Sequence, residues 1–201
     1  LDGVIGGLSV AVPGEVAGSE YLLDNYGSDA VSRQQIFQPA IDTANNGYVV
    51  GVTFKEELDS EYTGIAANET LSNIYLDESG LPYEVGDVIK NPDLAKTLQL
   101  IADGGKDAFY TGDMAQAMVD AVAAWGGNMT MEDLANYEVK VREPVVGHYK
   151  DYTIYSLPPA SSGGTHLVEI LNILENYDDM DKIGVNSAEY VHRFSEAFKI
   201  A

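Results

Sequence analysis

The residues best suited to chemistry lie in a short segment, residues 161–165 (SSGGT). An apolar pattern of helical spacing begins just after it, at Leu167, so the segment precedes a predicted helix. Backbone N–H groups and hydroxyls at a helix N-terminus can hold an anion or a carboxylate. The same residue types also serve as helix caps, and capping alone would explain them. The candidate binding residues are Ser161, Ser162, Gly163 and Gly164.

Other sources of chemistry find little support in the sequence. No G-x-S-x-G elbow surrounds a serine, and the chain has no Cys. The glycine-rich start up to Gly18 contains neither a phosphate-binding loop nor a dinucleotide fingerprint. His148, His166 and His192 are too far apart to form a zinc site on one helix. We therefore predict no catalytic residue, no metal site and no cofactor within this chain.

The charge of the chain excludes one class of partner. With 32 acidic and 11 basic residues the formal net charge is −21, whereas nucleic-acid binding requires clustered Lys and Arg. In so acidic a chain, neighbouring carboxylates are expected as solvated background.

The apolar runs are too short and too often interrupted by charge to span a bilayer. Two segments, Asn68-Glu69-Thr70 and Asn128-Met129-Thr130, fit the N-glycosylation pattern, which often arises by chance.

The N-terminal half predicts several helices around these residues. Pro13-Gly14 predicts a turn that leads into a helix from Val16 to Asn25. A second helix follows a Ser32 cap and ends at residues 45–47, and Pro39 within it predicts a kink or a later start. Residues 54–81 indicate helices and loops, and Asn91-Pro92-Asp93 begins another helix that ends at Gly104-Gly105.

The C-terminal half predicts further helices and a pair of strands. A capping box at Thr130 begins a short helix. Alternation over residues 145–149 and 152–156 predicts two antiparallel strands joined by Lys150-Asp151, although this dipeptide is not a favoured hairpin turn. Helices from Leu167 and from about Ser187 complete the chain. The most periodic helix has a predicted core face made of Met114, Ala117, Met118, Ala121, Val122 and Trp125.

The organisation is predicted to be simple. We find no internal repeat, linker or low-complexity tract, so residues 1–201 are expected to form a single, mainly helical α+β unit with a short strand pair near 144–156. The start lacks an initiator Met, and the last helical pattern stops without a closing residue. We therefore expect the chain to be a piece of a longer protein.

Several segments, in order, resemble the γ-glutamyltranspeptidase family. Residues 10–18 (VAVPGEVAG) are similar to its VPGxVAG segment, and residues 155–166 (YSLPPASSGGTH) to its YSxPPPSSGGxH segment, with Ala160 replacing a common third Pro. Weaker matches lie between them, at 91–95 (NPDLA), 109–112 (FYTG) and 131–134 (MEDL). The resemblance covers nearly the whole chain, which makes it more specific than any single motif.

The resemblance implies an internal piece of the large subunit of an N-terminal-nucleophile (αββα) hydrolase. Such enzymes cleave themselves into two subunits, and the new N-terminal Thr of the small subunit attacks γ-glutamyl amides such as glutathione. The implied partners are the missing N-terminal part and the small subunit, and the implied location is periplasmic or secreted. Arg33, Arg142 and Arg193 match no substrate-binding position of the family.

Three functional hypotheses remain open on the sequence. The chain could be a scaffold segment of a γ-glutamyl transferase or hydrolase, or of a related acylase or capsule-processing enzyme. It could belong to a non-catalytic relative that kept the helical part. It could also be an isolated folding unit, and we expect no activity from this polypeptide alone.

Overall fold

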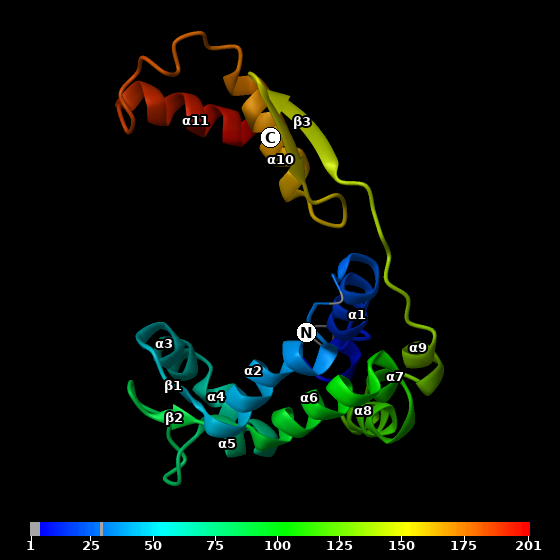
Figure 1. The fold of residues 1–201 in the computed structure, drawn as a ribbon. Helices are drawn as coiled ribbons and strands as arrows, with labels where there is room; N and C mark the ends of the chain where they lie inside the picture. The colour runs from blue at the N-terminus through cyan, green and yellow to red at the C-terminus, as the bar shows by residue number, and fades with distance from the viewer. Residues whose placement is uncertain (1–4, 29) are drawn as a thin grey trace. The chain divides into compact units, whose positions relative to one another are not determined.

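The computed structural model describes residues 5–28 and 30–201, which divide into two compact units, residues 1–139 and 140–201. Figure 1 shows the elements of the first unit in blue to green and those of the second in yellow to red. Among the described residues, no helix is both long and apolar enough to cross a membrane. The predicted class, mainly helical α+β with a short strand pair near residues 144–156, is confirmed.

The first unit contains nine α-helices within its described residues, a short 3-10 helix and one two-stranded antiparallel pair. The strands pair Tyr48 with Ile89 and Val49 with Val88. Its elements are η1 (Gly7–Ser9), α1 (Glu15–Tyr26), α2 (Arg33–Asn46), β1 (Tyr48–Val49), α3 (Val52–Ser60), α4 (Tyr62–Ala66), α5 (Glu69–Tyr75), β2 (Val88–Ile89), α6 (Pro92–Gly104), α7 (Lys106–Tyr110), α8 (Gly112–Ala124) and α9 (Met131–Ala135).

Local capping explains why several of these helices begin where predicted. The Ser32 hydroxyl accepts the N–H of Gln35 at the start of α2, and the Ser32 N–H donates in turn to Gln35 Oε1. Asn91 caps α6 through the N–H of Leu94, with Pro92 in the first turn. Helix α2 continues through Pro39 from Arg33 onward, so the alternative of a later helix start is wrong.

Three apolar clusters form the interior of the first unit. Helices α2 and α6 pack along each other through Ile41, Ala44, Ala95 and Ala102, and the three alanines allow close approach. A second cluster around Val50, Leu58 and Ile89 joins the strand pair to α3, α4 and the chain after α5. The third connects α1, α7, α8 and α9, and it borders the pocket described below.

One sequence prediction about this third cluster is wrong. Trp125 was expected in the core with the rest of the α8 stripe, but it is 60% exposed, and Ala117 and Ala121 are exposed as well. The inward face of α8 is instead formed by Ala115, Val122 and the partly buried Met118 and Val119. The helix is turned so that this face meets α7 and α9, which periodicity alone does not determine.

The second unit is a β-hairpin followed by two helices. It contains β3 (Val145–Tyr149), β4 (Tyr152–Ser156), α10 (Gly163–Leu174) and α11 (Ala188–Ile200). The strands are antiparallel, with Tyr149 opposite Tyr152 across the predicted two-residue turn, so the hairpin prediction is confirmed. Lys150 adopts a left-handed φ of 52° in this turn, a conformation that two-residue hairpin turns require.

Helix α10 packs on the hairpin and on α11. A Cβ at Gly147 would lie 2.6 Å from Val168 Cγ1, so only glycine permits this approach of strand to helix. Leu174 and Ala197 are fully buried where α10 and α11 meet. The Arg193 guanidinium binds Asp179 and lies over the Tyr177 ring, 4.5 Å from its centroid, and it thereby ties the loop before α11 to that helix.

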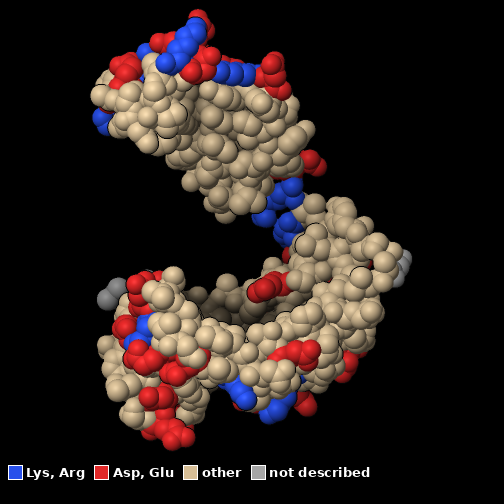
Figure 2. All heavy atoms as spheres, turned by 60° about the vertical axis from the view of Figure 1, so that its left-hand side comes forward, with Lys and Arg blue, Asp and Glu red and all other residues tan. Residues whose placement is uncertain are grey.

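Charge is spread over the surface of both units. The face in Figure 2 carries carboxylates in several separate places, with wide uncharged areas between them. This agrees with the expectation that most acidic residues of this chain are solvated background.

Candidate functional site

The predicted binding segment forms the connection between β4 and α10. Ser162 occupies the N-cap position of α10, but its side chain makes no capping hydrogen bond. Its main-chain carbonyl accepts the N–H of His166 at 3.1 Å. The Ser161 hydroxyl accepts the N–H of Gly163 at 3.3 Å. Two exposed hydroxyls therefore lie beside the first turn of α10, which begins four residues before the predicted start at Leu167.

Gly164 has a packing reason to be glycine. It is buried, and a Cβ there would overlap the Leu157 carbonyl oxygen and lie 3.1 Å from Ser156 Cβ. The start of α10 therefore approaches the end of β4 directly. Of the four candidates, Ser161, Ser162 and Gly163 are exposed, and the structure brings no acid, base or second nucleophile to them among the described contacts.

The histidines and paired acids are also dispersed. His148 lies on β3, His166 on α10 and His192 on α11, and all three are exposed. Within the part of the chain that the structure describes, no group of three or more His, Asp and Glu side chains could hold a metal ion. Asp179 is instead used in the ion pair with Arg193. Hydrogen bonding to this guanidinium lowers the pKa of Asp179 below its usual range.

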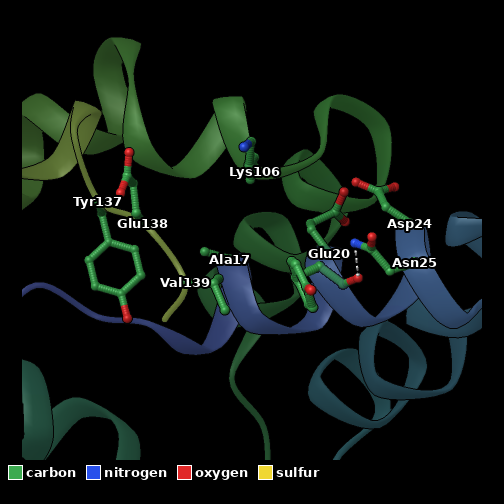
Figure 3. Close-up of a pocket in the computed structure, with 9 residues that line it drawn as sticks. Ala17, Glu20, Asp24, Asn25, Lys106, Tyr137, Glu138 and Val139 are labelled. Atoms are coloured by element: carbon green, nitrogen blue, oxygen red, sulfur yellow. Dashed lines mark hydrogen bonds between the residues drawn. The ribbon is translucent and has the colours of Figure 1, made fainter. Parts of the chain in front are cut away.

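A polar pocket of about 300 Å³ lies in the first unit (Figure 3). Figure 3 shows Glu20 and Asp24 on α1 near Lys106, with Tyr137 and Glu138 further along the wall. The lining residues include no Ser, Thr, Cys or His, so the pocket can hold polar groups but offers none of the Ser, Thr or Cys nucleophiles used in acyl transfer. Its lining residues are Ala17, Glu20, Tyr21, Asp24, Asn25, Lys106, Tyr137, Glu138 and Val139.

Glu20, in the wall of this pocket, is a buried carboxylate. It is 4% exposed and receives two hydrogen bonds from Arg33, Nε to Oε1 at 2.8 Å and NH2 to Oε2 at 2.6 Å. This bidentate pair joins α1 to the first turn of α2. A Cβ at Gly105 would lie 3.2 to 3.3 Å from both side chains, so the pair also fits closely against the α6–α7 junction. The ion pair therefore fixes the wall of the pocket.

Sequence reasoning missed this pair, although a signal was present. Glu20 lies three residues after the buried Ala17, and this spacing places both on the inward face of α1. An acid on an inward helical face requires a cationic partner. Because 32 acids stand in the chain, Glu20 was not distinguished from the solvated ones, and its partner Arg33 lies on another helix.

The Pro13-Gly14 turn is held by two tyrosines. The Tyr110 hydroxyl donates to the Pro13 carbonyl at 2.6 Å and accepts the N–H of Ala17 at 3.2 Å. The Tyr137 ring stacks on Tyr110 with centroids 5.6 Å apart and lies against Gly14, where a Cβ would be 3.0 Å from Tyr137 Cζ. Burial raises the pKa of Tyr110 above its usual value, so its hydroxyl remains protonated and can donate. The turn at the start of α1 is thus rigidly positioned.

The fold and the site define a mainly helical α+β scaffold with a polar pocket, a helix start beside two hydroxyls, and no assembled nucleophile among its described residues. The sequence model of the gamma-glutamyltranspeptidase family matches residues 2–201. The chain belongs to this family.

Individual relatives agree with this assignment. The chain is 39% identical to a glutathione hydrolase proenzyme of Escherichia coli over 96% of its own length and 33% of that protein. It is 38% identical to the acylase ACY 1 proenzyme of a Pseudomonas species, over 98% and 35%. The crystal structure of Helicobacter pylori gamma-glutamyltranspeptidase superimposes with a TM-score of 0.91 at 38% identity, over 98% of this chain and 56% of that one. The chain thus spans about a third of the length of the curated relatives.

Proposed function

We propose that these 201 residues are a scaffold segment of the large subunit of an enzyme that cleaves γ-glutamyl amides, such as glutathione. The enzyme passes the γ-glutamyl group to water or to an amino acid or peptide acceptor. The observation that carries this proposal is the family match over residues 2–201. The names of the relatives support the substrate class, since they include a glutathione hydrolase proenzyme.

In this proposal the nucleophile lies outside the chain. A Thr at the new N-terminus of the small subunit attacks the amide carbonyl, and its own α-amine acts as the general base. The proenzyme names of the relatives support a maturation step that creates this N-terminus. Self-cleavage, the small subunit as partner, and a periplasmic or secreted location are all parts of the proposal.

The residues of this chain contribute positioning. The Tyr110 hydroxyl and the stacked Tyr137 hold the Pro13-Gly14 turn, and the Glu20–Arg33 pair holds α1 against α2. A rigid scaffold maintains the geometry of a site to which it contributes few reacting groups. The SSGG segment, Ser161 to Gly164, is proposed as a binding element for a carboxylate at the start of α10.

Activity assays test this function. We expect no hydrolysis of a γ-glutamyl anilide by the 201-residue chain alone, and turnover by the matured parent enzyme. Replacing the Thr at the processing junction of the parent by Ala is expected to abolish both maturation and turnover. Turnover by the purified chain, or a parent that matures and turns over without this Thr, would refute the proposal.

The acylase reading remains as a second candidate, because the ACY 1 proenzyme matches almost as well as the glutathione hydrolase. The matured parent should therefore be assayed with γ-glutamyl amides and with cephalosporin amides, the donor class named for another structural relative, the cephalosporin acylase of Bacillus halodurans. A higher kcat/KM for the second class of donor would favour the acylase.

A further inference from the structure

The two Asn-X-Thr segments of the chain lie in different surroundings. The first, Asn68-Glu69-Thr70, is folded into the start of α5. Asn68 Oδ1 accepts the N–H of Leu71 at 3.0 Å, and the Asn68 main-chain carbonyl accepts the N–H of Ser72 at 2.8 Å. The carboxamide of Asn68 is therefore used as the helix cap, and Thr70 lies within the first helical turn.

The second segment, Asn128-Met129-Thr130, lies in the connection between α8 and α9. Met129 is 9% exposed and belongs to the third apolar cluster, whereas Asn128 and Thr130 are exposed. Thr130 is extended, with φ −120° and ψ 161°. Because successive residues of an extended chain point to opposite sides, Asn128 and Thr130 share the outer side. At the N-terminal end of the segment, the Gly127 N–H donates to the Val122 carbonyl at 2.9 Å and anchors the chain to the end of α8.

We propose that Asn128 is an acceptor for N-linked glycosylation on the folded protein, and that Asn68 is not. The co-reactant is a lipid-phosphate-linked oligosaccharide. The Asn128 Nδ2 attacks the sugar C1, and the N–C1 bond forms as the C1–O bond to phosphate breaks. The lipid phosphate leaves with the electron pair of that bond, and the proton lost by the amide nitrogen passes to solvent. In the described part of the chain no hydrogen bond engages the Asn128 carboxamide.

The two sites differ in what must open before the reaction. The Thr130 hydroxyl donates to Asp133 Oδ2 at 2.7 Å and accepts the Asp133 N–H at 3.1 Å, so it caps α9. Rotation of its side chain gives up this cap, but Thr130 is already extended and lies outside the helix, so no helical turn has to unwind. Asn68 becomes available only if its capping bond breaks and the first turn of α5 unwinds, because Thr70 is helical. The inference rests on export of the parent protein, since the modification takes place on the outer side of a membrane.

The test uses the folded parent protein, a purified single-subunit oligosaccharyltransferase that accepts Asn-X-Thr, and its lipid-phosphate-linked oligosaccharide. Peptide mass spectrometry measures occupancy at each Asn over time. Synthetic peptides spanning each segment report the reactivity of the same sequences without the fold. We expect both peptides to be modified, and Asn128 of the folded protein to react at least about tenfold faster than Asn68, the factor given by about 1.4 kcal/mol of opening free energy.

Matched variants complete the design. Asn128→Gln and Thr130→Ala should remove the modification of the folded protein, and Asn68→Gln should leave it unchanged. An Asn128 that stays unmodified in the folded protein or in its peptide would overturn the inference. So would equal rates at Asn68 and Asn128 in the folded protein. γ-Glutamyl turnover is measured separately, so a failure here leaves the proposed function untouched.

Discussion

Gly7→Ala tests the packing that holds the N-terminal segment on α8. The Gly7 N–H donates to the Trp125 carbonyl at 2.8 Å. A Cβ at Gly7 would lie 2.8 Å from Gly127 Cα and would overlap the Gly127 nitrogen and the Val122 carbonyl oxygen. These neighbours are backbone atoms, which cannot rotate away as a side chain could. The segment must therefore lift off α8 to accommodate the methyl group.

The expected magnitude follows from three terms. Overpacking against backbone costs about 1–3 kcal/mol, and loss of the Gly7–Trp125 hydrogen bond costs about 1 kcal/mol. The lower chain entropy of Ala in the unfolded state returns about 0.4–1 kcal/mol. We therefore expect Gly7→Ala to lower the free energy of unfolding by about 1–3.5 kcal/mol.

The assay is urea unfolding followed by tryptophan fluorescence. Trp125 is the single Trp of the chain and its carbonyl forms the hydrogen bond in question, so the signal reports on the first unit. Gly18→Ala is the matched control. Gly18 lies within α1 with nothing within 4 Å of an added Cβ, and we expect this change to raise stability by about 0.5–1 kcal/mol.

The decisive result is that Gly7→Ala lowers the free energy of unfolding whereas Gly18→Ala raises it. If Gly7→Ala unfolds at the same urea concentration as the original chain, the backbone at Gly7 does not lie as close to Gly127 and Val122 as described. Gly127→Ala should be destabilising for the same reason, because its Cβ would lie 2.6 Å from the Gly7 carbonyl carbon. The double variant should lose less stability than the sum of the two single losses, because both methyl groups disrupt the same contact.

Three further predictions concern charge. Arg33→Met should lower the free energy of unfolding by about 3 kcal/mol in urea titrations, because it leaves the Glu20 carboxylate buried and unpaired. Adding Glu20→Met should recover part of this loss. A double variant as unstable as Arg33→Met alone would contradict this prediction. Asp179→Asn should destabilise the second unit at pH 7 and weaken its pH dependence. Since Arg193 lowers the folded pKa of Asp179, the stabilisation by this ion pair is complete above the ordinary carboxyl pKa of about 4 and is lost as the pH falls below it. The melting temperatures of both proteins are measured by circular dichroism from about pH 7 to 2. The same pH dependence in both proteins would exclude this contribution. With a net charge of −21, the melting temperature should rise between about 0.1 and 1 M NaCl, as the screening length falls from about 10 to 3 Å, and a melting temperature independent of salt would refute self-repulsion.

The candidate site was only partly accessible to sequence reasoning. The SSGG segment was predicted to lie at a helix start, and it does. The polar pocket was not predicted, because its wall combines α1 with Lys106 and residues 137–139, which are distant in sequence. The difference in accessibility between Asn68 and Asn128 could not be predicted from the sequence either, because both segments fit the same pattern. Only the backbone conformation around each distinguishes them.

By itself the sequence determined the local elements and the family. Caps at Ser32, Asn91 and Thr130, and the alternation on either side of Lys150-Asp151, depend on neighbours within a few residues. Only the tertiary structure decided which helical faces turn inward. Trp125 belongs to an apolar stripe yet is exposed, and Glu20 belongs to an acidic chain yet is buried. The physical reason is that burial depends on which distant elements pack together, and a periodic pattern carries no information about its partner.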